Sequence, residues 1–434
     1  MLASLLAAFR IPDLRKRILF VFGMFAVYVV GLHIPIPGID RSVMENLIQN
    51  VQALGLLDIF TGGAFKRFTI FAMGITPYIN ASIIMQLLTI AIPELERLAK
   101  EGESGRKKIS QYTRYLTGIL AFVQAIGMDV MLSHAGAFTG TVGPSRLFMY
   151  FQIAITLTAG TAFLMWVGEQ ITDKGIGNGV SMVIFCGIMV SLPFQLSKTL
   201  ELYHAHSIHI GNLFMLALFF VLTVAGIVAI TQAQRKIPIQ HVKRVVGNKV
   251  YGGQSSFLPL RVNSAGVIPI IFAVSIIYLP ATIAQFFPNS DSLQEWTRWL
   301  SPADPDIWRR TVAGFFYALM IIFFTYFYTA VTFNVPDVAE NLKKWGSFIP
   351  GIRPGKPTEQ YLDKVMTRIT LAGAIFLSII ALLQYWVPQL TGVSANAFSL
   401  VGGTSLLIVV GVALETMQAI ESHLLMRHYE GFIK

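Results

Sequence analysis

The sequence is poor in charged residues and in cysteine. Charged side chains make up 13% of the 434 residues, and the single cysteine, Cys186, lies in an apolar stretch, which excludes an internal disulfide. The His-Glu-x-x-His, Gly-x-Ser-x-Gly and Gly-x-x-x-x-Gly-Lys motifs that mark metal, nucleophile and phosphate sites are also missing from the sequence. We therefore predict a protein without catalytic activity, without a metal site and without a bound cofactor.

Apolar residues are abundant instead. They make up 54% of the chain, and the mean hydropathy is +0.62. A helix of about 20 apolar residues crosses the roughly 30 Å hydrocarbon core of a bilayer. Charge-free stretches of at least this length run over residues 18–39, 68–93, 147–168, 175–197, 202–234, 262–290, 311–336 and 369–414.

The last of these stretches is long enough for two crossings. Pro388 and Gly392 divide it into two helices, and residues 115–134 add a further crossing that Asp129 interrupts. The first stretch follows three basic residues, but no small-residue cleavage pattern comes after it, so we expect an uncleaved first helix. The sequence thus predicts an all-α, polytopic membrane protein with ten transmembrane helices.

The basic residues indicate how these helices are oriented. If the N-terminus lies in the cytoplasm, 25 of the 33 Lys and Arg residues fall in cytoplasmic segments. Positive charge is enriched on the cytoplasmic side of membrane proteins. We therefore predict a multi-pass protein whose N- and C-termini are both cytoplasmic.

Two of the predicted cytoplasmic loops, 234–263 and 334–368, are long, basic and rich in glycine and proline. The first contains six Lys and Arg residues and no acidic residue. These charges could serve only to set the topology and to contact anionic lipids. They could also form a docking surface for an anionic partner, such as ribosomal RNA or an acidic protein face. We favour docking, since short loops suffice for topology.

The second and seventh predicted helices share a sequence pattern. Residues 74–81 align without gaps on residues 266–273, with glycine, proline, isoleucine and alanine at matching positions. Five helices in each half, an odd number, make the two halves inverted relative to each other. We predict an N-terminal half over 1–200 and a C-terminal half over 201–434. We also expect both prolines to loosen the hydrogen bonds inside these helices.

Residues 56–68, just before the second helix, are largely apolar but too few to span a membrane, and Gly62 and Gly63 interrupt them. They could form a half-helix that re-enters the protein from the outer side, since irregular backbone at membrane depth is tolerated inside protein or beside a water cavity. They could also form an amphipathic helix on the outer surface. We favour the re-entrant half-helix.

Ionisable residues are scarce in the predicted spans. Asp129, Glu415 and Glu421 approach such positions, and all three could lie near helix ends. An ion-coupled transporter generally carries ionisable residues at the middle of the membrane. An inverted-repeat secondary transporter of a small solute therefore remains as the alternative function, without support from the sequence.

Several short motifs are found in order along the chain. They are Ile-Pro-Ile-Pro-Gly at 34–38, Phe-Thr-Gly-Gly-Ala at 60–64, Glu-Gly-Glu-Ser-Gly-Arg at 101–106, Gly-Glu-Gln-Ile-Thr at 168–172, Lys-Gly-Ile-Gly-Asn-Gly at 174–179, Ala-Gly-Val-Ile-Pro at 265–269, Pro-Gly-Ile-Arg-Pro-Gly at 350–355 and Gly-Gly-Thr-Ser at 402–405. With them the chain resembles, over essentially its full length, the SecY family of channel-forming subunits of the general protein-secretion translocase, and its bacterial branch in particular. The resemblance implies a channel of two inverted halves in the bacterial cytoplasmic membrane. Secretory chains would cross it, and membrane proteins would leave it sideways into lipid.

The resemblance also implies a pore ring, a plug and a lateral gate formed by helices 2, 3, 7 and 8. The ring would be Ile75, Ile79, Val180, Ile184, Ile271 and Ile408, and the family commonly has isoleucine in place of Val180. The plug would cover about 57–68, with Leu57, Phe60, Gly62, Gly63 and Phe65. The first two ring residues are four apart, as are the next two, so each pair shares one helix face. Ordinary helix packing would produce the same spacing.

The resemblance implies partners as well. The two basic loops would bind the motor ATPase SecA or the ribosome. SecE and SecG would be further subunits, signal-bearing preproteins the cargo, and membrane lipids the surroundings. The residues expected to bind SecA or the ribosome are Arg235, Lys236, Lys243, Arg244, Lys249, Arg353 and Lys356. Among these, Arg353 matches an arginine that is important for coupling to the motor.

Overall fold

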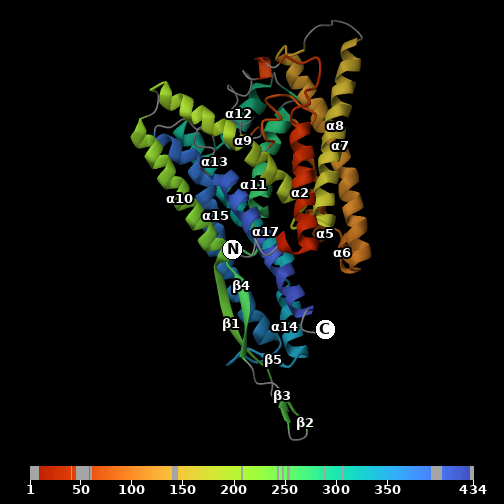
Figure 1. The fold of residues 1–434 in the computed structure, drawn as a ribbon, viewed down its shortest axis with the longest axis vertical. Helices are drawn as coiled ribbons and strands as arrows, with labels where there is room; N and C mark the ends of the chain where they lie inside the picture. Colours follow the sequence, from red (N-terminus) through yellow and green to blue (C-terminus); the bar gives the residue numbers. More distant parts are fainter. Residues whose placement is uncertain are drawn as a thin grey trace.

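The computed structural model shows an elongated bundle of helices with a small β-sheet at one end (Figure 1). The structure describes residues 9–40, 42–44, 58, 61–138, 145–206, 209–241, 244–246, 249–251, 255–284, 286–287, 290–302, 304, 306–391 and 403–430.

The described helices have the following bounds: α2 Pro12–Gly31, α5 Thr76–Ala91, α6 Pro93–Lys100, α7 Glu103–His134, α8 Ser145–Lys174, α9 Gly179–His204, α10 Ile210–Gln232, α11 Ile268–Ala284, α12 Asp291–Leu300, α13 Ile307–Thr332, α14 Val335–Lys344, α15 Lys356–Thr391 and α17 Gly403–Glu430. The described strands are β1 Gln234–His241, β2 Arg244–Val246, β3 Lys249–Tyr251, β4 Ser255–Arg261 and β5 Ser347–Phe348.

Each of the predicted membrane spans contains a described helix. Seven of these helices are long and apolar enough to cross a membrane, and α5 together with α6 adds a bent eighth. α2 and α11 occupy the two remaining predicted spans, with 20 and 17 residues. The all-α, polytopic membrane fold is therefore confirmed, and ten transmembrane helices are consistent with it. The boundary between the two halves at residues 200 and 201 falls near the end of α9 and stays a prediction.

The two matching prolines lie at helix starts rather than inside helices. Pro77 is the second residue of α5, and Pro269 is the second residue of α11. A proline in the first turn removes no helical hydrogen bond, because the N–H groups there have no partner within the helix. Our expectation that these prolines loosen the helices was therefore wrong. Gly74 and Gly266 precede them with φ angles of +56° and +65°, so both helices begin just after a left-handed turn.

The bent pair α5 and α6 turns by 100° at Ile92. Ile92 is extended, with φ −109° and ψ 114°, which is the conformation that a residue before proline prefers. Pro93 then opens α6, in which the described side chains are not buried. Pro93 thus marks the point at which α5 ends and the chain turns by 100° into α6.

The loop predicted at 234–263 contains strands, which the sequence analysis did not anticipate. β1 pairs antiparallel with both β4 and β5, and β2 pairs with β3 in a separate hairpin. Ile237 and Ile239 on alternate positions of β1 are buried, and with Leu260 they pack against Leu342 of α14 and Leu362 of α15. The sheet is therefore held against the bundle on one face, while β2 and β3 project away from it (Figure 1).

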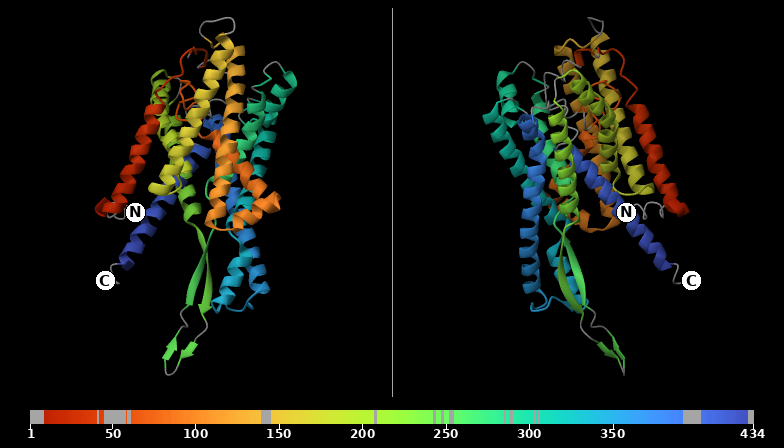
Figure 2. Two further views of the ribbon diagram at one scale, coloured as in Figure 1. Left: turned by 90° about the vertical axis from the view of Figure 1, so that its right-hand side faces the viewer. Right: turned by 60° about the vertical axis from the view of Figure 1, so that its left-hand side comes forward.

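The largest apolar cluster lies at the centre of the bundle and joins helices from both halves. Its buried members include Tyr28, Ile184, Ile270, Tyr317 and Leu407, which come from five different helices. Among the seven long apolar helices, α9 and α17 are the most buried, with 56% of their most apolar windows inside the structure, against 11% for α10. In Figure 2, α2 begins and α17 ends at the end of the bundle that carries the sheet.

Candidate functional site

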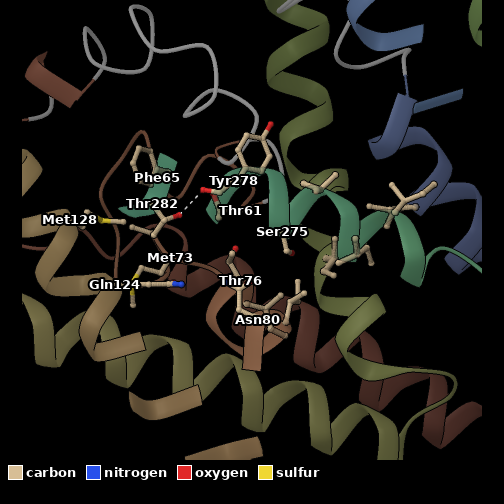
Figure 3. A pocket seen from close by; sticks show the side chains of 18 residues that line it. Thr61, Phe65, Met73, Thr76, Asn80, Gln124, Met128, Ser275, Tyr278 and Thr282 are labelled. Carbon is tan, nitrogen blue, oxygen red and sulfur yellow. Dashed lines mark hydrogen bonds between the residues drawn. The ribbon is translucent and has the colours of Figure 1, made fainter. Parts of the chain in front are cut away.

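A cavity of about 100 Å³ lies between helices of the predicted N-terminal half and helices of the predicted C-terminal half (Figure 3). Its walls come from α5, α7, α9, α11, α17 and the segment before α5. The lining residues are Thr61, Phe65, Ala72, Met73, Ile75, Thr76, Ile79, Asn80, Gln124, Met128, Ile184, Ile270, Ile271, Val274, Ser275, Tyr278, Thr282 and Ile408.

Five of the six residues predicted for the pore ring line this cavity: Ile75, Ile79, Ile184, Ile271 and Ile408. Ile75, Ile184 and Ile408 are buried, with exposed fractions of 6%, 5% and 1%. The other two are partly buried. The sixth, Val180, does not line the cavity. It lies in the first turn of α9 and packs, partly buried, against the same apolar cluster.

The plug segment contributes two side chains to the cavity, those of Thr61 and Phe65. From Thr61 onward it runs in turns rather than in a helix, since Gly62 and Gly63 have φ angles of +71° and +81°. A Cβ atom at Gly62 would lie 3.0 Å from the carbonyl oxygen of Gly187 in α9, so the segment lies directly against that helix. The predicted plug residues Leu57 and Phe60 lie outside the described residues.

Hydrogen bonds to its backbone hold the plug segment in place. The Tyr28 hydroxyl of α2 donates to the Thr61 carbonyl oxygen at 3.2 Å. The N–H of Ile36 donates to the Phe68 carbonyl oxygen at 3.0 Å, and that of Ile70 donates to the Ile34 carbonyl oxygen at 3.1 Å. The plug segment is thus hydrogen-bonded near Thr61 to α2 and near Phe68 to residues 34–36, which follow α2 in the chain.

Asp58 is the acidic residue of the plug segment and is partly buried. Its Oδ1 accepts a hydrogen bond of 2.7 Å from the backbone N–H of Lys66. Burial raises the pKa of the Asp58 carboxyl to about 6, although this hydrogen bond and the charges of Lys66 and Arg67 oppose the rise. The Lys66 Nζ lies 5.1 Å from the centre of the Phe194 ring of α9. Asp58 can therefore change its charge near neutral pH inside the plug.

Several polar side chains line the cavity beside the apolar ones. Four of them come from three helices that face one another: Thr76 and Asn80 from α5, Gln124 from α7 and Ser275 from α11 (Figure 3). The sequence analysis missed them. A polar side chain inside an apolar stretch was the available signal, but many such residues exist, and only the packing of α5 and α7 opposite α11 brings these four together. They form a polar patch where the two halves meet.

The residues predicted to bind a partner lie at the end with the sheet. Arg235 and Lys236 are exposed on β1, and Arg353 and Lys356 are exposed around the start of α15. The carbonyl oxygen of Arg353 accepts a hydrogen bond of 2.8 Å from the Thr358 hydroxyl. This bond fixes the turn that presents the guanidinium side chain.

The three remaining predicted partner residues follow β1 in the sequence. Arg244 lies on β2 and Lys249 on β3, while Lys243 lies outside the described residues.

Among the described residues, no three His, Cys, Asp or Glu side chains gather in a way that could hold a metal ion.

The chain is similar in sequence and in fold to known proteins. A profile of the SecY family matches residues 69–417. The protein translocase subunit SecY of Streptomyces coelicolor is 45% identical to this chain over 100% of both proteins. The protein of the same name from Thermus thermophilus is 44% identical over 100% of this chain and 98% of its own. That of Pseudomonas aeruginosa is 46% identical over 98% and 94%.

Solved structures agree in fold. The structure of a protein conducting channel has a TM-score of 0.67 at 19% identity and covers 94% of this chain and 92% of its own. Sec61 in the canine ribosome-channel complex from the endoplasmic reticulum has a TM-score of 0.63 at 17% identity, with the same coverage. The solved structures show the fold, whereas the family profile and the full-length relatives show the family. The chain belongs to the SecY family.

Proposed function

We propose that this chain is the central subunit of a protein-conducting channel. It translocates secretory proteins across the cytoplasmic membrane and releases membrane proteins sideways into the lipid. The observation that carries this proposal is the shared cavity, which five ring residues and two plug residues line together. The name protein translocase subunit, which relatives 44 to 46% identical carry over nearly the whole chain, supports it.

The pore ring consists of Ile75, Ile79, Val180, Ile184, Ile271 and Ile408. A narrow ring of branched apolar side chains resists wetting, so it blocks ions when the channel is empty. The same side chains make no specific hydrogen bonds, so they can close around a passing chain of any sequence. Val180 belongs to the ring on the strength of its place one turn before Ile184 in α9.

The plug covers about 57–68 and closes the channel from the outer side, with Thr61 and Phe65 at its inner surface. α5 and α7 on one side and α11 and α13 on the other form the lateral gate. The contact of α7 with the end of α11 supports this: a Cβ atom at Gly127 would lie 2.6 Å from the Phe286 ring. Opening therefore requires the two halves to part at the polar patch of Thr76, Asn80, Gln124 and Ser275.

The channel draws its energy from partners and has no catalytic activity of its own. SecA or the ribosome docks on the basic surface of Arg235, Lys236, Lys243, Arg244, Lys249, Arg353 and Lys356, while SecE and SecG complete the complex. The exposed positive charge on β1 and at the turn before α15 supports an anionic partner.

This docking surface and both chain termini face the cytoplasm. The start of α2, the end of α17 and the sheet all lie at one end of the bundle (Figure 2), and this end carries most of the basic residues.

Reconstitution tests the proposed function. The chain is placed in vesicles with SecE and SecG, and SecA, ATP and a signal-bearing preprotein are added. We expect the preprotein to become protease-protected inside the vesicles. The alternative, a secondary transporter, instead predicts uptake of a small solute along an ion gradient without SecA. Solute uptake without preprotein protection would overturn the proposal.

A further inference from the structure

Two glycines and two side chains interlock where α17 crosses the start of α11. A Cβ atom at Gly411 of α17 would lie 2.5 Å from Cγ1 of Val267. In return, a Cβ atom at Gly266 would lie 2.6 Å from Oε1 of Glu415, one turn further along α17. Each glycine thus makes room for a side chain of the other element. We call these four residues the reciprocal glycine contact.

Glycine is favoured at both positions, for different reasons. Gly266 has a φ of +65°, a conformation that other residues rarely adopt. Gly411 is inside a helix, where glycine is less favourable than alanine because it exposes backbone and has more freedom to lose on folding. Real Cβ atoms are not found 2.5 Å from a carbon atom, so α17 can lie this near to Val267 only with glycine at position 411.

The reciprocal glycine contact lies one helical turn from two residues of the proposed pore ring. Ile271 follows Val267 by four residues, and its N–H donates to the Val267 carbonyl oxygen at 3.3 Å. Ile408 precedes Gly411 by three residues on α17. Both isoleucines line the central cavity. A shift between α17 and the start of α11 therefore moves two ring residues relative to each other.

The first half builds the matching position differently. Gly74, which aligns with Gly266, has a φ of +56° and precedes Ile75 of the ring. A Cβ atom there would lie 2.8 Å from Cγ2 of Thr61 in the plug segment. The start of α5 is thus packed by the plug, and the start of α11 by a transmembrane helix. The second half of the ring has a support that does not depend on the plug.

We propose that Gly266, Val267, Gly411 and Glu415 are positioning residues that set the bore of the pore ring by holding the start of α11 against α17. This rests on the ring assignment of the proposed function. With the contact intact, Ile271 and Ile408 close the waist in the resting channel. With it forced apart, the waist widens and admits ions even while the plug is seated.

Gly411→Ala provides the main test, in vesicles that contain the chain with SecE and SecG. We expect the ion leak of the resting channel, per inserted molecule, to rise about tenfold, since an added methyl group must push the two elements apart. Gly118→Ala in α7 is the matched control, because no described atom lies within 4 Å of a Cβ atom at that helical glycine. Its leak should equal that of the unmodified chain.

A second substitution separates positioning from general damage. With Val267→Ala added to Gly411→Ala, the nearest atom of residue 267 lies 3.9 Å from the new methyl group, an ordinary contact. The double variant should therefore return to within about twofold of the original leak.

The outcomes distinguish this inference from the ring itself. If Ile408→Asn raises the leak but Gly411→Ala does not, the positioning role is wrong and the ring stands. If neither changes the leak, the ring assignment fails and the inference fails with it. A leak in Gly411→Ala that Val267→Ala leaves unchanged would also overturn the inference, because the clash would not be its cause.

Discussion

The central cavity and the sheet at the end of the bundle are built on opposite principles. The cavity gathers branched apolar side chains from α5, α9, α11 and α17, far apart in the sequence, and buries Ile184 and Ile408 almost completely. The sheet is formed mainly by β1 and β4, which are close in the sequence, and exposes basic side chains such as Arg235 and Lys236. In the proposed function, one surface repels water and ions, whereas the other attracts charged partners. Sealing and docking should therefore be separable by mutation.

The largest effect should come from the docking end. We expect Arg353→Glu to abolish SecA-driven export, because reversing an exposed charge places like charges opposite each other at an anionic partner. The ion leak of the resting channel should stay unchanged. Export of a preprotein into vesicles measures the first quantity, and ion flux measures the second.

Lys108→Glu is the matched control for this reversal, since Lys108 is exposed at the same end but outside the proposed docking surface. It should export normally. A raised leak in Arg353→Glu would show that docking and sealing are not independent.

At the cavity, we expect Ile408→Asn to raise the resting leak more than about tenfold, because an amide in a dry constriction attracts water. Ile408 is 1% exposed and lines the cavity. Preprotein export should persist, since the docking surface is intact. Ile408→Val, which keeps a branched apolar side chain, should leak like the original chain. Equal leaks for the asparagine and valine variants would contradict an apolar seal.

The plug segment should respond to pH through Asp58. Burial raises the pKa of this carboxyl from 3.8 to about 6, so the seated plug binds a proton that a displaced plug releases. The seated plug is therefore most stable below the pKa of 3.8, and this stabilisation is lost as the pH rises through about 6. The ratio of seated to displaced plug should fall about tenfold between roughly pH 5 and pH 7.

Thiol labelling measures this ratio in a Cys186→Ser background with a cysteine at Ala64, a fully buried plug position. Labelling should rise with pH after correction for the reactivity of the thiol itself. In Asp58→Asn, which cannot ionise, the corrected labelling should be flat. A slope that survives in the asparagine variant would assign the effect to another group.

The smallest effect is expected at the plug's tie to α2. Tyr28→Phe removes the hydrogen bond to the Thr61 carbonyl oxygen and should increase plug displacement about fivefold, as one buried hydrogen bond contributes about 1 kcal/mol. The same labelling at Ala64 measures it. Tyr326→Phe, which removes an exposed bond to the Thr367 carbonyl oxygen, should change nothing.

The spans could be predicted from the sequence because a membrane leaves the backbone no other solution. A crossing segment must satisfy its own hydrogen bonds, so it is a helix, and it must be apolar over about 20 residues. That rule located helices in all the predicted stretches. It failed at Pro77 and Pro269, since composition alone does not tell a proline inside a helix from one that opens it.

The sheet and the polar patch escaped prediction for a different reason. Alternation along β1 is short, and Ile237 and Ile239 are buried only because α14 and α15 cover that face. Thr76, Asn80, Gln124 and Ser275 are ordinary polar residues until three helices bring them together. Neither feature is local, so neither leaves a local pattern.

Composition and ordered motifs were enough to predict where the spans lie, which end is basic and which family the chain resembles. Only the packing of the helices shows which isoleucines share a cavity and that Gly411 meets Val267. Val267 and Gly411 lie more than a hundred positions apart, as do Ile271 and Ile408. Close packing works through distances of a few ångströms between distant segments, and a linear pattern does not carry them.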